Sequence, residues 1–163
     1  MTKRILHFLF VIAACVSLNS CSQTKTVNTD AEKTKVKSVV DDFKNFWETK
    51  DMNLLSKIMS HDANMVNYGT DANEIFVGFE AFKDSITPML SSVDGIKINV
   101  RNQTINVDAD GNAAWFSEIW DWDISMGGQT MQQHNLRLTG VLEKDDGNWV
   151  IVQFHNSVPS MPQ

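Results

Sequence analysis

The sequence predicts an α+β fold in which helices come first and a long antiparallel sheet follows. Apolar residues recur with a helical period as far as residue 90 and alternate with a period of two from Ile96 onward. One domain is expected, because 163 residues lie within the usual size of a single domain. Hydrophobic residues make up 42% of the chain, which excludes a protein that is disordered throughout.

The first twenty residues are predicted to be a targeting segment rather than part of the fold. Lys3 and Arg4 precede an apolar run over residues 5–16. This run is too short to span a membrane as a helix, but it has the length of a signal-peptide core. Residues 18–21, Leu-Asn-Ser-Cys, follow directly and resemble the bacterial lipobox, in which the cysteine becomes lipidated and N-terminal.

We therefore expect a lipoprotein signal peptide over residues 1–20 and lipidation of Cys21. Residues 21–29 would form a polar tether, and residues 30–163 the domain. The protein would lie in the bacterial cell envelope, held to a membrane through this anchor alone. Because no acidic run follows Cys21, we expect it to face the periplasm. The alternative is an ordinary secretory signal in which Cys21 is incidental.

Two helices and a short hairpin are predicted after the tether. The first helix is expected to start near Thr29, which has capping-box spacing to Glu32. Asp51 can cap a second, shorter helix. A short hairpin follows, with strands over residues 63–68 and 74–77.

A third helix is predicted to begin after Gly78, with phenylalanine, isoleucine and leucine side chains on one face. Pro88 falls inside this pattern. Proline lacks a backbone N–H and restricts the residue before it, so we expect the helix to end or kink near Thr87.

Four long strands are predicted in the second half of the chain. Apolar residues lie at even positions over 96–100 and at odd positions over 105–107, which predicts a bulge at residues 101–104. Turn sequences at residues 108–112, 127–128 and 145–148 then separate strands over residues 113–124, 130–144 and 149–157.

The last strand is apolar on both faces in this interpretation. Strict alternation places Trp149 and Ile151 on one face, and Val150, Val152 and Phe154 on the other. Helices can cover one face only, so the other needs a second cover. We expect a symmetric homodimer to supply it.

Residues 141–157 combine an aspartate-glycine turn, a tryptophan, an apolar strand, a histidine and a serine (VLEKDDGNWVIVQFHNS). This ending and the order of the elements resemble the SnoaL-like branch of the nuclear transport factor 2-like superfamily. Gly69-Thr70-Asp71, Glu74 and Gly78 are similar to its middle region. The resemblance covers residues 31–158. It implies a cystatin-like cone, in which a curled antiparallel sheet wraps on three N-terminal helices and encloses a pocket.

The superfamily includes polyketide cyclases, isomerases and dehydratases, as well as non-catalytic members, so the fold alone decides little about function. One such member is the association domain of calcium/calmodulin-dependent kinase, whose pocket is lined by arginines. Trp120, Gly140 and Asn156 align with those arginines, and none of them is basic. We therefore expect no binding of carboxylate ligands in that manner.

Glu118 is the first candidate for chemistry. Alternation places it on the same face as Phe116, Trp120 and Trp122, with Ser117, Asp121 and Asp123 on the opposite face. A carboxylate between aromatic walls has a raised pKa, which suits a general acid or base near neutral pH. The alternatives are that Glu118 pairs with Arg137 or His134 of the neighbouring strand, or lies at a solvated rim.

His155 is the second candidate, because it lies near the end of the last strand, where a family pocket could open; a structural role is the alternative. Other tryptophan and methionine side chains, such as Trp115, Met126 and Met131, are expected mostly in the core. The resemblance implies a ligand pocket lined by Phe82, Phe116, Glu118, Trp120, Trp122, Gly140 and Asn156.

Several classes of site are not expected. A net charge of −6 argues against nucleic-acid binding, which needs a basic face. Two cysteines are too few for a disulfide scaffold or a cysteine-based zinc site, and the histidines lack ligand spacing. Asp121 and Asp123 offer fewer oxygens than calcium needs. We expect no metal and no cofactor.

These observations favour a membrane-anchored protein that binds a small apolar molecule in the cone pocket. The first alternative is a small acid–base enzyme of the isomerase, cyclase or dehydratase type that uses Glu118 or His155. The second alternative is a non-catalytic dimerisation module.

Overall fold

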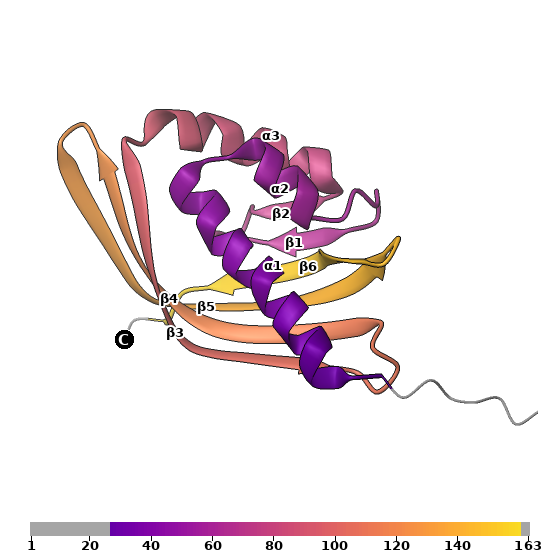
Figure 1. Cartoon of the computed structure of the whole chain (residues 1–163). Coiled ribbons are helices and arrows are strands. Elements are labelled where there is room, and N and C mark those ends of the chain that lie inside the picture. Colours follow the sequence, from indigo (N-terminus) through magenta and orange to yellow (C-terminus); the bar gives the residue numbers. More distant parts are fainter. Residues whose placement is uncertain (1–26, 161–163) are drawn as a thin grey trace, which may run out of the picture.

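The computed structural model describes residues 27–160, so the predicted signal peptide and Cys21 lie outside the described residues. Three helices and six strands form an α+β fold, as predicted (Figure 1). The elements are α1 (Thr29–Thr49), α2 (Met52–Ile58), β1 (Val66–Tyr68), β2 (Ile75–Val77), α3 (Phe79–Ser92), β3 (Gly95–Val107), β4 (Ala113–Met126), β5 (Gln129–Asp145) and β6 (Asn148–Ser157).

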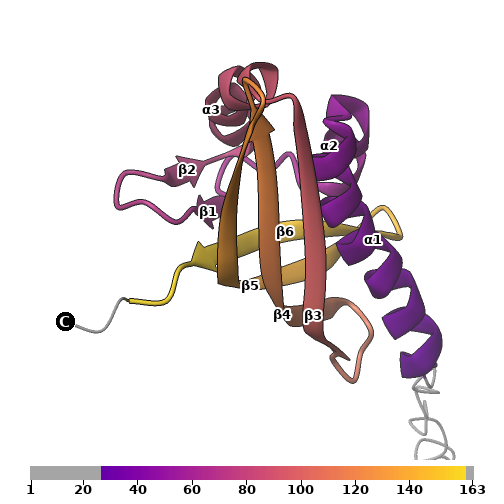
Figure 2. The same cartoon turned by 90° about the vertical axis from the view of Figure 1, so that its left-hand side faces the viewer.

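All six strands belong to one sheet in the order β2-β1-β6-β5-β4-β3. Neighbouring strands are antiparallel except β1 and β6, which meet in parallel at Tyr68 and His155. The sheet curls and does not close, and the helices lie on its concave side (Figures 1 and 2). This arrangement confirms the predicted cone-shaped fold.

The caps of the first two helices follow the sequence, with one correction. Asn28, not Thr29, caps α1, because its Oδ1 accepts the backbone N–H of Ala31 at 3.1 Å. Asp51 caps α2 as predicted, accepting the N–H groups of Asn53 and Leu54. These side chains satisfy N–H groups that have no partner within the first turn of a helix.

We expected α3 to end or kink near Thr87. The helix does not end there, because it continues through Pro88 to Ser92. Pro88 and Asp84 both lie on the exposed side of α3. Water can therefore satisfy the Asp84 carbonyl that loses its helical donor, which lowers the usual cost of an interior proline.

A bulge in β3 lies where the phase change predicted it, between Arg101 and Thr104. A further bulge, in β6, was not predicted and corrects the expected faces of that strand. Leu142 pairs with Ile151, and Gly140 pairs with Phe154. The side chains of Ile151 and Phe154 therefore both point to the concave side, where they are buried. The apolar residues of β6 are therefore mostly directed inward, and the outer face is less apolar than strict alternation suggests.

The core is a continuous aromatic cluster between the helices and the sheet. Phe43 of α1 contacts Trp120 and Phe154, with ring centroids 5.9 and 5.2 Å apart. Trp47 contacts Trp122 at 5.1 Å and Phe82 at 6.3 Å. Aromatic pairs at these spacings contribute beyond the burial of their area. The space inside the cone is filled largely by the protein's own rings.

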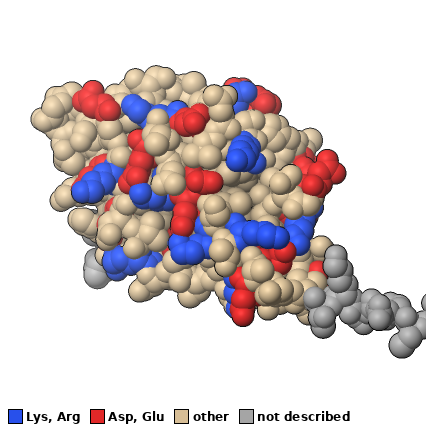
Figure 3. Space-filling model, in the orientation of Figure 1, with Lys and Arg blue, Asp and Glu red and all other residues tan. Residues whose placement is uncertain are grey.

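Three side chains expected mostly in the core are instead exposed, namely Trp115, Met126 and Met131. On the face that carries α1, positive and negative side chains are interspersed without a continuous basic patch (Figure 3). Pairs such as Lys37 with Asp41 follow helical spacing there. None of the helices within residues 27–160 is long and apolar enough to cross a membrane.

Candidate functional site

Glu118 is a buried acid on the concave face of β4, with 2% of its surface exposed. Its Oε1 accepts the indole N–H of Trp120 at 2.6 Å, and its Oε2 accepts the amide of Gln103 at 2.9 Å. Neither Arg137 nor His134 is its partner. Both carboxyl oxygens are thus held by neutral donors.

The bulge in β3 explains how Gln103 reaches this acid. Arg101 pairs with Ile119 and Thr104 with Ser117, so Asn102 and Gln103 together oppose Glu118 without ordinary pairing. Asn102 takes a positive φ of 54°, a conformation that asparagine tolerates better than most residues. The bulge therefore directs a side-chain donor at the buried carboxyl, as bulges near functional sites often do.

An aspartate of α1 completes this cluster. The Gln103 amide nitrogen also donates to Oδ1 of Asp41 at 3.2 Å, and Asp41 in turn pairs with Lys37 at 2.6 Å. One amide therefore links two carboxyl groups that come from α1 and β4. Gln103 and Asp41 were not predicted as site residues, because both contacts depend on how α1 crosses the sheet.

Glu118 borders a cleft of about 440 Å³ between α1 and the sheet. Val40, Ile98 and Val100 give the cleft an apolar wall. The polar part of its lining consists of Asp41, Lys44, Asn45, Gln103 and Glu118. The cleft therefore has an apolar side and a polar side. Small-molecule sites likewise combine apolar walls with polar groups that orient the ligand.

The environment of Glu118 raises its pKa above the ordinary value for a glutamate. Burial is the main cause, because it disfavours the charged form. The hydrogen bonds from Gln103 and Trp120 oppose this effect, and the nearby charge of Asp41 adds to it. A buried carboxyl with a raised pKa beside a cleft is a typical candidate for ligand recognition or proton transfer.

The aromatic residues of the expected pocket lie together on the concave side but are packed. All four of them are buried, namely Phe82, Phe116, Trp120 and Trp122. The indole N–H of Trp122 has no hydrogen-bond partner in the part of the chain that the structure describes. None of these four borders the cleft beside Glu118. That they line a ligand pocket stays a prediction.

The other two expected pocket residues also face inward. A Cβ added at Gly140 would lie 2.5 Å from the Phe116 ring and 2.8 Å from the backbone oxygen of Gln153. A larger side chain there would displace the core. Asn156 is buried, and its side-chain oxygen has no hydrogen-bond partner among the described residues.

His155 lies on the opposite face of the sheet from Glu118. Its neighbour Asn156 pairs with Leu138 and points inward, so His155 points outward. There it is exposed and meets the ring of Tyr68 edge-on at 5.7 Å. The structure therefore does not bring the two sequence-predicted acid–base residues together.

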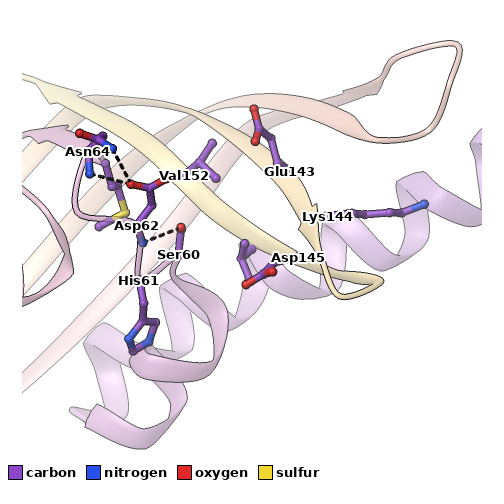
Figure 4. Close-up of a pocket in the computed structure, with 10 residues that line it drawn as sticks. Ser60, His61, Asp62, Asn64, Glu143, Lys144, Asp145 and Val152 are labelled. Atoms are coloured by element: carbon purple, nitrogen blue, oxygen red, sulfur yellow. Dashed lines mark hydrogen bonds between the residues drawn. The ribbon is translucent and has the colours of Figure 1, made fainter.

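A second pocket, of about 400 Å³, lies beside the turn end of β5 and β6 (Figure 4). Its polar side chains are occupied locally: Asp62 accepts both the backbone N–H and the side-chain amide of Asn64, and the Asp62 N–H donates to Ser60. Asp62 and Asn64 are exposed and Ser60 is buried, and their hydrogen bonds hold the loop between α2 and β1. We therefore regard the cleft at Glu118 as the better candidate site.

Residues 27–160 contain no group of three histidine, cysteine, aspartate or glutamate side chains arranged to hold a metal ion. On the outer face, Asp121 is held by Arg101 through two hydrogen bonds of 2.8 and 2.9 Å. Those bonds hold the pKa of Asp121 well below its usual range. Asp121 is thus a structural partner of Arg101 rather than half of a calcium site.

Solved structures with this fold are numerous. A candidate dehydratase of the NTF2-like family from Streptomyces avermitilis is 15% identical, with a TM-score of 0.70, and the match covers 81% of this chain and 99% of that one. An NTF2-like superfamily protein from Salmonella enterica is 18% identical, with a TM-score of 0.71 and coverage of 82% and 95%. A candidate ketosteroid isomerase from Shewanella frigidimarina is 17% identical, with a TM-score of 0.64 and coverage of 77% and 97%.

No curated protein matches the chain. The family model of the SnoaL-like domain matches residues 36–161, which span most of the chain and every strand and helix described above except the first turns of α1. This match agrees with the resemblance of residues 141–157 and with the cone-shaped fold. The chain belongs to the SnoaL-like domain family, and it has the fold of the NTF2-like structures.

Proposed function

We propose that this protein binds a small, largely apolar molecule in the cleft between α1 and the sheet, with Glu118 as its polar recognition group. The observation that carries the proposal is that Glu118 is buried yet borders an open cleft. Burying a carboxyl group is costly unless it is well paired. Here the donors are two neutral groups, Trp120 and Gln103, and no lysine, arginine or histidine within residues 27–160 pairs with the carboxyl oxygens.

The cleft lining suggests the chemistry of the ligand. Val40, Ile98 and Val100 would contact its apolar part. A hydroxyl or amide group on the ligand would then reach the remaining lone pairs of Glu118, because a carboxylate can accept more than two hydrogen bonds. Such a ligand has one polar end and one apolar body.

A ligand in this cleft would lie beside α1 and away from the centre of the cone. Phe43, Trp120 and Phe154 fill that centre with their own rings. A ligand at the centre would have to displace this cluster. A ligand in the cleft beside α1 needs no such rearrangement.

A ligand screen on the full chain tests the proposal. Compounds with an apolar ring and one hydroxyl or amide group should raise the unfolding temperature, and a ligand at 100 times its Kd adds about 2.7 kcal/mol. Val100→Phe should abolish the effect by narrowing the cleft. Asn106→Phe adds the same ring at an exposed position of β3 and should leave the effect intact.

Native mass spectrometry of the protein purified from its host provides an independent measurement. Retained mass that disappears in Val100→Phe but persists in Asn106→Phe supports a ligand in the cleft. If no compound stabilises the protein and no mass is retained, the binding function is refuted.

The second candidate is a small enzyme in which Glu118 transfers a proton. It is favoured by the raised pKa of this buried carboxyl, which brings a glutamate closer to the range needed for catalysis at neutral pH. Structural neighbours described as a candidate dehydratase and a candidate ketosteroid isomerase are compatible with such chemistry. The absence of His155 from this face means that Glu118 would act with Gln103 and Asp41 instead.

Once a binding compound is known, its conversion can be followed directly. Glu118→Gln keeps the shape of the side chain but cannot exchange a proton at neutral pH. It should remove turnover while binding persists, whereas His155→Ala should leave the rate unchanged. Turnover that survives Glu118→Gln would show that Glu118 does not transfer the proton, and a bound compound that is not converted would leave binding as the function.

We further propose that acylated Cys21 holds the domain to a membrane on the periplasmic side. Val27 packs against Gly111, where an added Cβ would lie only 2.5 Å from Val27 Cγ1. Six residue-to-residue steps separate Cys21 from Val27 and can span at most about 22 Å. This anchor would keep the domain close to the bilayer surface.

Cell fractionation tests this anchor. The full chain should sediment with membranes and carry the mass of a lipidated N-terminus at Cys21. Cys21→Ala should abolish the lipid mass. Processing of the wild-type chain at a site other than Cys21, without lipid, would show an ordinary secretory signal instead.

A further inference from the structure

Three stretches of strand edge in the sheet differ in how they are protected. The β2 edge is only three residues long. The β3 edge is covered by α1, because Ile98 donates its N–H to Glu48 Oε1 at 2.8 Å. The third edge belongs to the first half of β5, residues 129–136, since β6 begins to pair with β5 only at Arg137.

Residues 129–135 of β5 form one side of an arm that also contains the end of β4 and the start of β3 (Figures 1 and 2). Every side chain from 129 to 135 is exposed. No Asp, Glu, Lys, Arg or Pro occurs from residue 124 to residue 136. Proteins usually block free strand edges with such residues, so this edge lacks the common protection against pairing.

The backbone groups that face the free edge can be identified from the ladder. The N–H of Ile98 points away from β4, and N–H groups alternate along an antiparallel ladder. Trp122, opposite Ile98, therefore directs its backbone groups toward Gln133 of β5. By the same alternation Met131 faces β4, whereas Thr130 and Gln132 face the free edge.

We propose that two copies of this chain associate through these edges, antiparallel, about a two-fold axis at Met131. Thr130 of each copy would exchange backbone hydrogen bonds with Gln132 of the other. Met131 would then oppose its symmetry mate in a non-hydrogen-bonded pair, where Cα atoms approach to about 4.5 Å. Pairing would cover the Met131 side chains, which are now 56% exposed.

Charge favours a second copy as the occupant. The chain has a net charge of −6, so two copies repel each other as a whole, and an uncharged contact adds nothing to that repulsion. The arm edge is uncharged over its whole length, and antiparallel self-pairing brings no like charges together. The two-fold contact is closed, so pairing stops at a dimer. This dimer differs from one formed through the outer sheet face and is independent of the ligand site.

Disulfide trapping in the full chain tests the proposed register. Met131→Cys places two thiols across the axis within the Cα separation that a disulfide requires. Mild oxidation should yield at least about tenfold more linked dimer than Met126→Cys, a matched methionine on the neighbouring strand, because β4 strands would lie three strand spacings apart. The parent chain, oxidised in the same way, is the control: any linked dimer that it forms comes from its own two cysteines.

Three further substitutions identify the contact that carries the cross-link. Thr130→Pro in the Met131→Cys chain removes an edge N–H but no bond to β4, and should abolish the cross-link, whereas Thr130→Val should retain it. Trp115→Lys alters the outer face and should have no effect. Equal cross-linking of Met131→Cys and Met126→Cys, or a cross-link lost with Trp115→Lys but not with Thr130→Pro, would overturn the proposal.

Discussion

Glu32 and Glu118 each accept a hydrogen bond from a tryptophan indole, yet their pKa values move in opposite directions. Glu32 lies at the start of α1 and accepts the N–H of Trp149 at 2.7 Å. Glu118 accepts the N–H of Trp120 at 2.6 Å. The pKa of Glu32 is lowered to about 2, whereas that of Glu118 is raised.

The difference lies in the remaining partners. Glu32 also accepts hydrogen bonds from Lys35 at 2.9 Å and pairs with Lys144 at 3.0 Å, so cations stabilise its charged form. The second donor to Glu118 is the neutral amide of Gln103, and burial dominates. An indole donor alone does not offset the desolvation of a carboxylate.

Glu32 is a structural acid, whereas Glu118 belongs to the candidate site. Glu32 connects α1 to the turn between β5 and β6, because Trp149 and Lys144 flank that turn. Its negative charge is balanced by Lys35 and Lys144 within the fold. The burial of Glu118 is not offset by a cation, so its carboxyl group favours a proton or a further hydrogen-bond donor. It also borders a cleft that a ligand can enter.

The largest expected effect is on stability at Glu32. Glu32→Ala removes the acceptor of Trp149 and two charged contacts, and should lower the free energy of unfolding by about 2–3 kcal/mol at pH 7. Denaturant unfolding of the full chain measures this loss. Glu80→Ala removes an exposed acid that pairs only with Lys83 and should cost less than about 0.5 kcal/mol. Equal losses would show that Glu32 is an ordinary surface acid.

The pH dependence of unfolding should show opposite signs for the two acids. The folded pKa of Glu32 is below its unfolded value of 4.5, so its contribution to stability is present above that value and is lost as pH falls toward 2. The folded pKa of Glu118 is raised, so its contribution is present below 4.5 and is lost as pH rises through the folded pKa.

Denaturant titrations from pH 2 to pH 8 separate the two contributions. Glu32→Gln should reduce the loss of stability in acid, and Glu118→Gln should reduce the loss on the way to neutral pH. If both variants change the profile in the same direction, the pKa of Glu118 is not raised by the fold.

A cation placed beside Glu118 should make it resemble Glu32. Gln103→Lys puts an ammonium group between Glu118 and Asp41, and should lower the pKa of Glu118 by about 1–3 pH units. Carbon-detected NMR titration of the Glu118 carboxyl group measures this pKa. Asn106→Lys adds the same charge at an exposed position of β3 and should leave the pKa nearly unchanged. If neither substitution changes the pKa of Glu118, the side chain at position 103 does not contact the Glu118 carboxyl group.

Most of the fold was predictable because its determinants are local. The change from helical to alternating periodicity identified the helices and the four long strands, and the phase change beside Val100 placed the β3 bulge. The β6 bulge was missed because Val150, Ile151 and Val152 are all apolar. A register shift of one residue there does not change the order of apolar and polar residues in the sequence. Pro88 was misjudged because its exposure depends on tertiary packing.

The candidate site was predictable only in part. Glu118 stood out because it is the acid on an otherwise aromatic face of β4. Asp41 and Gln103 could not be found, because they are 62 residues apart and meet only where α1 crosses the β3 bulge. His155 was grouped with Glu118 from its position near the strand end, whereas the β6 register turns it outward.

The smallest expected effect distinguishes the two lysines that hold Glu32. The side chain of Lys35 is 62% exposed, whereas Lys144 is 24% exposed and lies 5.0 Å above the Trp149 ring. Exposed ion pairs contribute little, so Lys35→Met should lower the free energy of unfolding by about 0.2–0.5 kcal/mol. Lys144→Met should cost about 1 kcal/mol, since it also loses a cation–π contact. Denaturant unfolding at low and high salt checks both values, and salt should reduce the Lys35 effect more strongly, because exposed pairs are screened. A larger loss for Lys35→Met would place the support of Glu32 within α1 instead of across to the β5–β6 turn.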